Sequence, residues 1–597
     1  MLQVRSEGEI LDLSPNQEIS LTFDNPFFES DRIPIAVSTP IEFMITPQTC
    51  RIFQFVPAML IAPGVRKKSA ELLMNGLVIC SGALIFDEYA DNRLSYTFVG
   101  ADFEDVASGN LSDIKFNLYE DTSFSTLVSN ARSGACRDFA LPQIMRQDFS
   151  GESEYRKSTD TYPECSGTDK YANWLGSVSP YVVPAIPVAR ILESVLPDLS
   201  IYGYDLNRLL DKLAILGINK SKENDSRFGV IPTYYVGSRP YPYTPPTRCT
   251  LDLADSMPDM SVADFISNLL KMTCSTLFCQ GRNYTIWPNE NILTSTSYID
   301  WDNRVSSTYS CSTEEGQKYS LSFQSSDSEY TESNPDDPDQ LADTPSVLEA
   351  SNMMDVISKI KTADGIVSVK HVPSGDIISG WKESVYLYHS LRGTWNSLKT
   401  TVALTDIAYQ SGFSPKEISS DEETTQEYDC SVSFHVPKCV PTEIYYTTST
   451  NADGSINQLV GLCSMTPVID LPGIGGSRSD EVYIGLLLDN NFVDKGVYFT
   501  RPVYGIDPGT EMSSTLSLAI EGDNGLFEMF HKTFADWIAK TKSPRRVDLN
   551  LSPSDIAGLS LWKKYLMWNQ TWLIKSLEIT LSTSTDYISA TADIVPV

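Results

Sequence analysis

The sequence predicts a mainly β protein with α+β insertions, divided into several small domains of the β-barrel or sandwich type. Three observations lead to this fold class. Apolar and polar residues alternate in short runs near both ends of the chain, dipeptides typical of tight hairpin turns separate some of these runs, and long runs with a period of 3.6 residues are scarce. The chain has 597 residues, which is too many for one hydrophobic core, so we expect several domains.

The N-terminal part carries the clearest strand signals. Residues 19–23 alternate between apolar and hydroxyl side chains, which is typical of a half-buried strand. The dipeptide Asn75-Gly76 favours a type I′ hairpin turn, because both residues tolerate positive φ. A second turn leads into the alternating run 94–98, and the run 111–119 is interpreted as a further strand. We expect these short antiparallel strands to close into a small barrel or sandwich.

The middle of the chain alternates between loop-rich and regular segments. Two helical patches are predicted at 188–196 and 206–216, and prolines at 240–246 indicate a boundary. The clearest unit is a helix over 262–272, with a serine at its N-cap position, followed by a hairpin over 274–287.

The C-terminal part returns to regular structure. An apolar stripe predicts a helix over 525–540, which Pro544 ends. A short helix is expected from Pro553, since proline favours the first helical position. Strands are predicted at 547–551, 563–567, 571–581 and 587–595.

These patterns predict four domains. They are an N-terminal β-barrel-like domain (1–125), a loop-rich α+β domain (126–250), an α+β domain with the helix–hairpin unit and an acidic mobile loop at 324–346 (251–385), and a second barrel-like β domain with a C-terminal helix and hairpin (386–597).

The charge of the chain limits its partners. It has 77 acidic and 45 basic residues, a net charge of −32, which opposes general binding to nucleic acid or to anionic membranes. The short basic runs at 66–68 and 545–546 are interpreted as solvated charges. No secretory signal and no apolar run of about 18 residues is present. We therefore expect a chain made in the cytoplasm, without a membrane anchor.

The sequence offers no catalytic, cofactor-binding or metal-binding residues. Its eleven cysteines are scattered without metal-ligand spacing, so Cys50, Cys80, Cys274 and Cys279 are predicted to be free thiols. The four histidines are isolated, and His435, in a strand-like context, is interpreted as a satisfied structural histidine. The glycine run at 471–477 is interpreted as a flexible loop, because it lacks the lysine of a phosphate loop. Acidic residues are frequent throughout the chain, so the sequence does not decide whether two of them form the carboxylate pair of a glycosidase.

Three stretches resemble hub-type tail proteins of tailed bacteriophages. The first runs from Asn25-Pro26-Phe27-Phe28 through Arg51-Ile52-Phe53 to 68–82 and 93–100, the second is Met257–Ile266 with its hairpin, and the third runs from 547–554 to Lys563-Lys564-Tyr565 and 573–577. Together they cover about a third of the chain, and they are packing and turn motifs. The chain departs from compact hubs in its length and in the acidic insert at 324–346.

The resemblance implies a structural, non-enzymatic hub subunit of the baseplate or tail-tip type in the virion tail, assembled in the cytoplasm of a host bacterium. It implies a homotrimeric ring of barrel domains that joins the tail tube to the tip or spike, with tape measure and fibre proteins as further neighbours. DNA would pass through the ring only in transit, during genome ejection. The alternatives are a peripheral baseplate or fibre-attachment protein, a tail-associated cell-wall hydrolase, and a cell-surface carbohydrate-binding protein, which the missing export signal disfavours.

Overall fold

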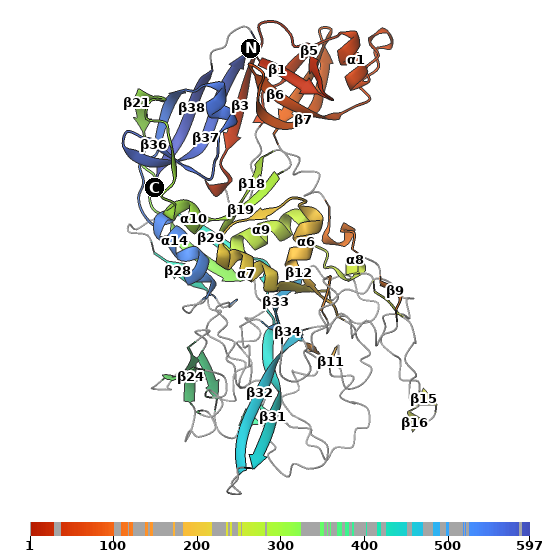
Figure 1. Ribbon diagram of the computed structural model, residues 1–597, viewed down its shortest axis with the longest axis vertical. Coiled ribbons are helices and arrows are strands. Elements are labelled where there is room, and N and C mark those ends of the chain that lie inside the picture. Colours follow the sequence, from red (N-terminus) through yellow and green to blue (C-terminus); the bar gives the residue numbers. More distant parts are fainter. Residues whose placement is uncertain are drawn as a thin grey trace.

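The described part of the chain is mainly β, with helices inserted between its sheets (Figure 1). The mainly β fold with α+β insertions is therefore confirmed, while the domain boundaries stay predictions. The computed structural model describes residues 2–28, 37–100, 109–116, 119–122, 138–140, 144–146, 171–172, 183–217, 235–236, 239–240, 249–251, 253–280, 283–323, 347–351, 355, 359, 367–372, 377–380, 385–386, 401–402, 415–419, 426–450, 456–469, 481–489, 497–500, 518, 520, 525–583 and 588–597.

One large sheet contains strands from both ends of the chain and fourteen of the described strands. Its N-terminal strands are β1 (Leu2–Ser6), β2 (Glu9–Leu11), β3 (Glu18–Asp24), β4 (Val37–Ser38), β5 (Ile41–Met44), β6 (Lys67–Met74), β7 (Leu77–Ala90) and β8 (Arg93–Val99). The others are β20 (Tyr298–Asp300), β21 (Val305–Cys311), β35 (Arg545–Asn550), β36 (Lys564–Met567), β37 (Gln570–Ser582) and β38 (Ser589–Pro596). The main path of the sheet runs β2-β1-β6-β7-β8-β4-β3-β37-β38-β35-β21.

Strands β3 and β37 join the two ends of the chain. They pair antiparallel from Glu18 opposite Ser582 to Asp24 opposite Ser576. Ile19 on β3 is fully buried, as the alternation predicts. Side chains from the N-terminal and the C-terminal strands therefore fill one common core.

The predicted hairpin turns are confirmed, but one predicted strand is wrong. Asn75 and Gly76 have φ of 54° and 80° between β6 and β7, as a type I′ turn requires. The run 111–119 begins instead with a 3-10 helix, η3 (Leu111–Asp113). Asn110 and Asp113 form a reciprocal capping box there, and this local bonding favours a helical turn over a strand.

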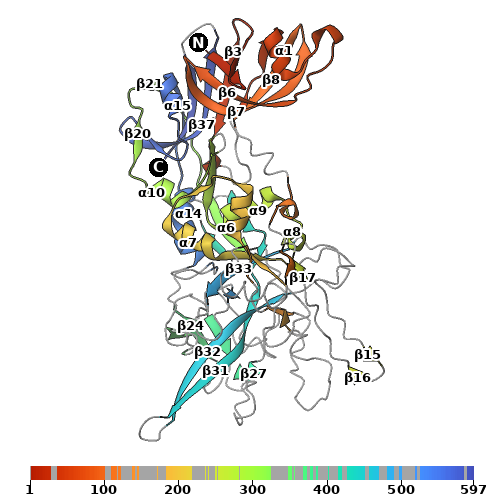
Figure 2. The same cartoon turned by 45° about the vertical axis from the view of Figure 1, so that its right-hand side comes forward.

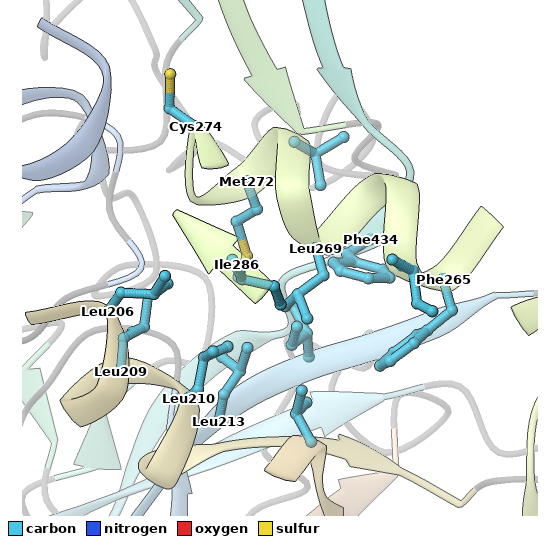
Figure 3. Packing of buried hydrophobic residues seen from close by; sticks show 14 of the residues in the cluster. Leu206, Leu209, Leu210, Leu213, Phe265, Leu269, Met272, Cys274, Ile286 and Phe434 are labelled. Carbon is cyan, nitrogen blue, oxygen red and sulfur yellow. The ribbon is translucent and has the colours of Figure 1, made fainter. Parts of the chain in front are cut away.

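A second core lies in an α/β unit below the large sheet (Figure 1). Its helices are α6 (Val188–Val195), α7 (Tyr204–Lys212), α8 (Leu253–Ser256), α9 (Val262–Met272), α10 (Asn289–Thr294), the π-helical turn η5 (Phe527–His531) and α14 (Lys532–Ile538). Its strands are β12 (Ala185–Pro187), β13 (Ser200–Ile201), β14 (Leu213–Leu216), β18 (Ser275–Gln280), β19 (Asn283–Pro288), β22 (Lys318–Phe323), β28 (Lys416–Ile418), β29 (Glu427–Val432), β30 (Phe434–His435) and β33 (Val482–Asp489). Leucines of α7 and apolar residues of α9 meet in this core (Figure 3).

The helix predictions hold with one exception. Helix α9 has the predicted bounds, and the Ser261 hydroxyl accepts from the backbone N–H of Asp264 at its N-terminus. The helix expected over 525–540 is formed by η5 and α14. The helix expected over 206–216 ends at Lys212, because the next four apolar residues form the fully buried strand β14, which pairs with β12 and β33.

A long hairpin extends away from the α/β unit (Figures 1 and 2). It is formed by β31 (Lys438–Thr450) and β32 (Ile456–Ile469). The acidic run 324–346 and the glycine run 471–477 lie outside the described residues. Within the described ranges, none of the helices combines the length and the apolar character needed to cross a membrane.

Candidate functional site

A pocket of about 70 Å³ lies where the large sheet meets the α/β unit. Its walls come from the 3-10 helix η1 (Pro26–Phe28), the stretch 314–317, α14 and the sheet strands β37 and β38. The lining residues are Phe27, Phe28, Glu314, Glu315, Gln317, Tyr428, Trp537, Ile538, Lys542, Lys575 and Val595.

Asn25 directs the chain from the large sheet into this junction. Its side chain is 1% exposed, and its Nδ2 donates to the carbonyls of Leu561 (2.9 Å) and Ile574 (2.7 Å). Its Oδ1 accepts from the backbone N–H of Phe27 (3.0 Å). Both amide hydrogens and the amide oxygen are therefore bonded, which satisfies a polar group that would be costly to bury unpaired.

Aromatic rings form the wall of the pocket. Phe27 leaves the large sheet and packs edge-on against Phe534 and Trp537 of α14, with ring centroids 5.4 Å apart in both pairs. Phe28 lies 6.0 Å from Trp537. Such pairs contribute about 0.5–1.5 kcal/mol each beyond the area they bury. The Asn-Pro-Phe-Phe motif thus ties the sheet to the α/β core.

Two lysines carry the positive charge of the pocket. Lys542 Nζ lies 4.2 Å from the centre of the Trp537 ring and donates to the carbonyls of Ile538 (3.3 Å) and Lys540 (3.1 Å). Burial lowers the pKa of Lys542 to about 8, although Glu314 acts in the opposite direction. Lys575 Nζ lies 3.8 Å from Oε1 of Glu314, so the rim carries charges of both signs.

The side chains of the pocket suit the binding of another protein segment. Its ionisable members are two glutamates, two lysines and a tyrosine, and its walls are apolar rings. An apolar side chain flanked by a charged group would find both a dry surface and a counter-charge there. Among the described residues, no group of three or more His, Cys, Asp or Glu side chains is arranged to hold a metal ion.

A second polar cluster is enclosed in the α/β core. His531 is fully buried, with its Nε2 3.0 Å from the carbonyl oxygen of Met272 and its Nδ1 2.5 Å from the Tyr319 hydroxyl. Because a carbonyl only accepts, Nε2 carries the proton and Nδ1 accepts from Tyr319. Burial lowers the pKa of His531 to about 4. The ring is therefore held neutral and joins η5 to β22 and to the end of α9.

Two buried thiols lie near this cluster, and Cys274 is a free thiol. Burial raises the pKa of the Cys274 thiol well above its usual value, and Asn289 Nδ2 lies 3.6 Å from its sulfur. Cys430 Sγ lies 3.4 Å from the carbonyl oxygen of Lys271. A thiol with a raised pKa forms little thiolate, so Cys274 is chemically inert in the folded chain. The structure also leaves Cys50, Cys80 and Cys279 as free thiols.

Two interpretations of single residues need correction. Arg545 was expected to be a solvated charge, but its guanidinium lies 4.3–5.1 Å from the rings of Tyr309, Trp568 and Trp572, as cation–π packing on the sheet. His435 was expected to be a satisfied structural histidine, yet its Nδ1 is buried without a hydrogen-bond partner within the described structure.

The sequence did not reveal the pocket, since its members come from six separate stretches of the chain. The Asn25-Pro26-Phe27-Phe28 motif was the one available signal. Two adjacent phenylalanines after an Asn-Pro turn indicate apolar packing beyond the strand they follow, but the pattern does not say against which element.

Comparison with known proteins finds similar solved structures. No family model matches the sequence, and no curated protein matches it. The chain is similar to the 43 kDa tail protein of prophage MuSo2 from Shewanella oneidensis, with 6% identity and a TM-score of 0.32, covering 100% of this chain and 98% of that chain. It is also similar to the tail protein from Neisseria meningitidis MC58, with 6% identity and a TM-score of 0.30, covering 100% of this chain and 95% of that chain.

Proposed function

We propose that the chain is a structural, non-enzymatic protein of a bacteriophage tail, and that within the tail it is a hub subunit. The hub would form a ring on the tail axis, join the tail tube to the tip or spike, and let DNA pass during ejection. The observation that carries the proposal is that the three hub-like stretches of the sequence meet in space at the junction of the two cores.

The first of these stretches contacts both of the others. The Asn25 side chain donates to the carbonyl of Ile574 in the third stretch. Helix η1 contacts β18, the first strand of the hairpin in the second stretch. Motifs more than 500 residues apart thus build one local structure. This is expected if the resemblance reflects a shared architecture, and it supports the proposal.

The charge of the chain supports a role as a conduit. A net charge of −32 repeated around a ring repels the phosphates of passing DNA and disfavours tight binding. We propose a closed trimer in which acidic side chains predominate on the inner wall. A heterologous interface has to close in this way, because an open one would grow into a filament.

The test is to locate the chain in intact tails. A peptide tag that replaces part of the 324–346 insert is labelled with an antibody fragment, and the tails are imaged by single-particle electron microscopy. We expect three labels in a closed ring on the axis, and a ring lumen lined mainly by acidic residues. Labels away from the axis would overturn the hub and favour a peripheral baseplate or fibre-attachment protein. A lumen lined mainly by Lys and Arg would overturn the conduit.

The non-enzymatic part of the proposal has its own test. The purified chain is incubated with bacterial peptidoglycan, and released reducing sugar and new amino groups are measured. We expect no release above that of heat-denatured protein. Release at a rate proportional to protein concentration would favour a tail-associated cell-wall hydrolase.

A further inference from the structure

The loop after α1 (Pro47–Phe53) exposes an unusual set of apolar side chains. Met59 is 70% exposed, Leu60 is 75% exposed and Ile61 is 49% exposed. They lie on and just after the 3-10 helix η2 (Pro57–Met59). Adjacent exposed aliphatic residues are uncommon on a soluble surface and mark contact sites. We call residues 56–61 the apolar knob.

The backbone of the knob is held in a strained shape. Leu60 has a φ of 51°, in the left-handed region that bulky residues rarely adopt. Its N–H donates to the carbonyl of Pro57 (3.1 Å), and the N–H of Ile61 donates to Val56 (3.4 Å). A strained leucine in water gives an isolated chain no advantage, so strain and exposure at the same residue point to a bound partner.

The charge around the knob favours an acidic partner. Residues 51–70 contain four basic residues and no acidic one, and two of the four pair with glutamates of the β1–β2 hairpin. Arg66 is exposed and makes no ion pair with any residue the structure describes. The net charge of −32 makes two copies repel overall, so the counter-charge on a second copy of this chain has to come from a local acidic patch.

The pocket between the large sheet and the α/β unit, which we call the junction pocket, offers a surface on the second copy that is complementary to the knob. Its half-buried rings of Phe28, Tyr428 and Trp537 suit an aliphatic side chain. Glu315 on its rim is exposed and has no ion pair within the described ranges. The pocket therefore combines an apolar floor with the negative charge of Glu315, while the apolar tip of the knob is followed in the chain by the positive charge of Arg66.

We propose that the knob of one copy seats Leu60 in the junction pocket of the next copy, with Arg66 against Glu315. This inference rests on the proposed ring. Helix α1 and helix α14 lie on different sides of the molecule in both views (Figures 1 and 2). A contact between two such different patches is heterologous, and it closes a ring when the rotation between copies permits.

The test measures self-association of the full chain by sedimentation velocity over a range of concentrations. Leu60→Asn removes the apolar tip but keeps a residue that tolerates positive φ, so the fold is retained. Leu77→Asn is the matched control, since Leu77 is an exposed leucine (42%) that begins β7, directly after the Asn75-Gly76 turn. We expect Leu60→Asn to weaken association at least about tenfold with an unchanged melting temperature, and Leu77→Asn to leave both unchanged.

Charge reversal tests the pairing. Arg66→Glu and Glu315→Arg should each weaken association, and the double variant should recover it. A ring that all of these variants leave intact overturns this contact while the proposed hub stands. A wild-type chain that stays monomeric at every concentration overturns the ring and the contact together. Wild-type binding to phosphatidylcholine–phosphatidylglycerol vesicles that Leu60→Asn abolishes, with association unchanged, overturns the contact and assigns the knob to a membrane.

Discussion

Acid should loosen the α/β core through His531. Its pKa is about 4 in the folded chain against 6.5 for an ordinary histidine, because protonation would place a charge in the core and remove the bond from Tyr319. A depressed histidine pKa stabilises the fold fully above pH 6.5, and this contribution is lost as pH falls towards 4. The full loss corresponds to about 3 kcal/mol, of which about 2 kcal/mol is lost by pH 5.

Hydrogen exchange of the 525–540 segment, corrected for intrinsic rates, measures this loss as the free energy of local opening at pH 7 and pH 5. The His531→Gln variant has no titrating ring, so its opening free energy should fall by about 2 kcal/mol less than that of the wild type. His435→Gln is the matched control, because it removes a histidine of the same unit outside the network. Equal losses in the wild type and in His531→Gln would refute the reasoning.

Three further predictions concern single residues. Asn25→Ala leaves two buried carbonyls and an N–H unbonded and should cost about 3 kcal/mol in thermal unfolding; a loss below about 1 kcal/mol would contradict its role at the junction. Cys311 is exposed, so a thiol reagent should label it at once, whereas Cys274 should react only after unfolding; rapid labelling of both would show that the core opens freely. Between pH 7 and 8 Lys542 loses much of its charge, whereas Glu528 raises the pKa of Lys532. Acylation followed by peptide mapping should therefore find Lys542 modified before Lys532. The reverse order would argue against a depressed pKa of Lys542.

Local patterns predicted the hairpins and helices where one strong signal acted alone. The Asn75-Gly76 turn and the Ser261 cap are examples, since each specifies its own backbone geometry. Prediction was wrong where two signals competed. The run 111–119 alternates like a strand, but the capping box of Asn110 and Asp113 makes its start helical.

The arrangement of the elements could not be predicted in the same way. Alternation tells which face of a strand is buried but does not name its neighbour, so the pairing of β3 with β37 was not foreseen. The junction pocket was missed for a related reason. Asn25 bonds to main-chain carbonyls, which every residue possesses, and no side-chain pattern marks them.

The pairing of β3 with β37 also constrains how the chain is made. Strand β3 leaves the ribosome before its partner, which ends at Ser582, so all the residues between the two strands are synthesised before the strands can meet. Until then one edge of β3 is an open template for another nascent chain. Translation that stops before β37 would therefore yield a fragment with an unpaired β3 edge, which is prone to aggregate.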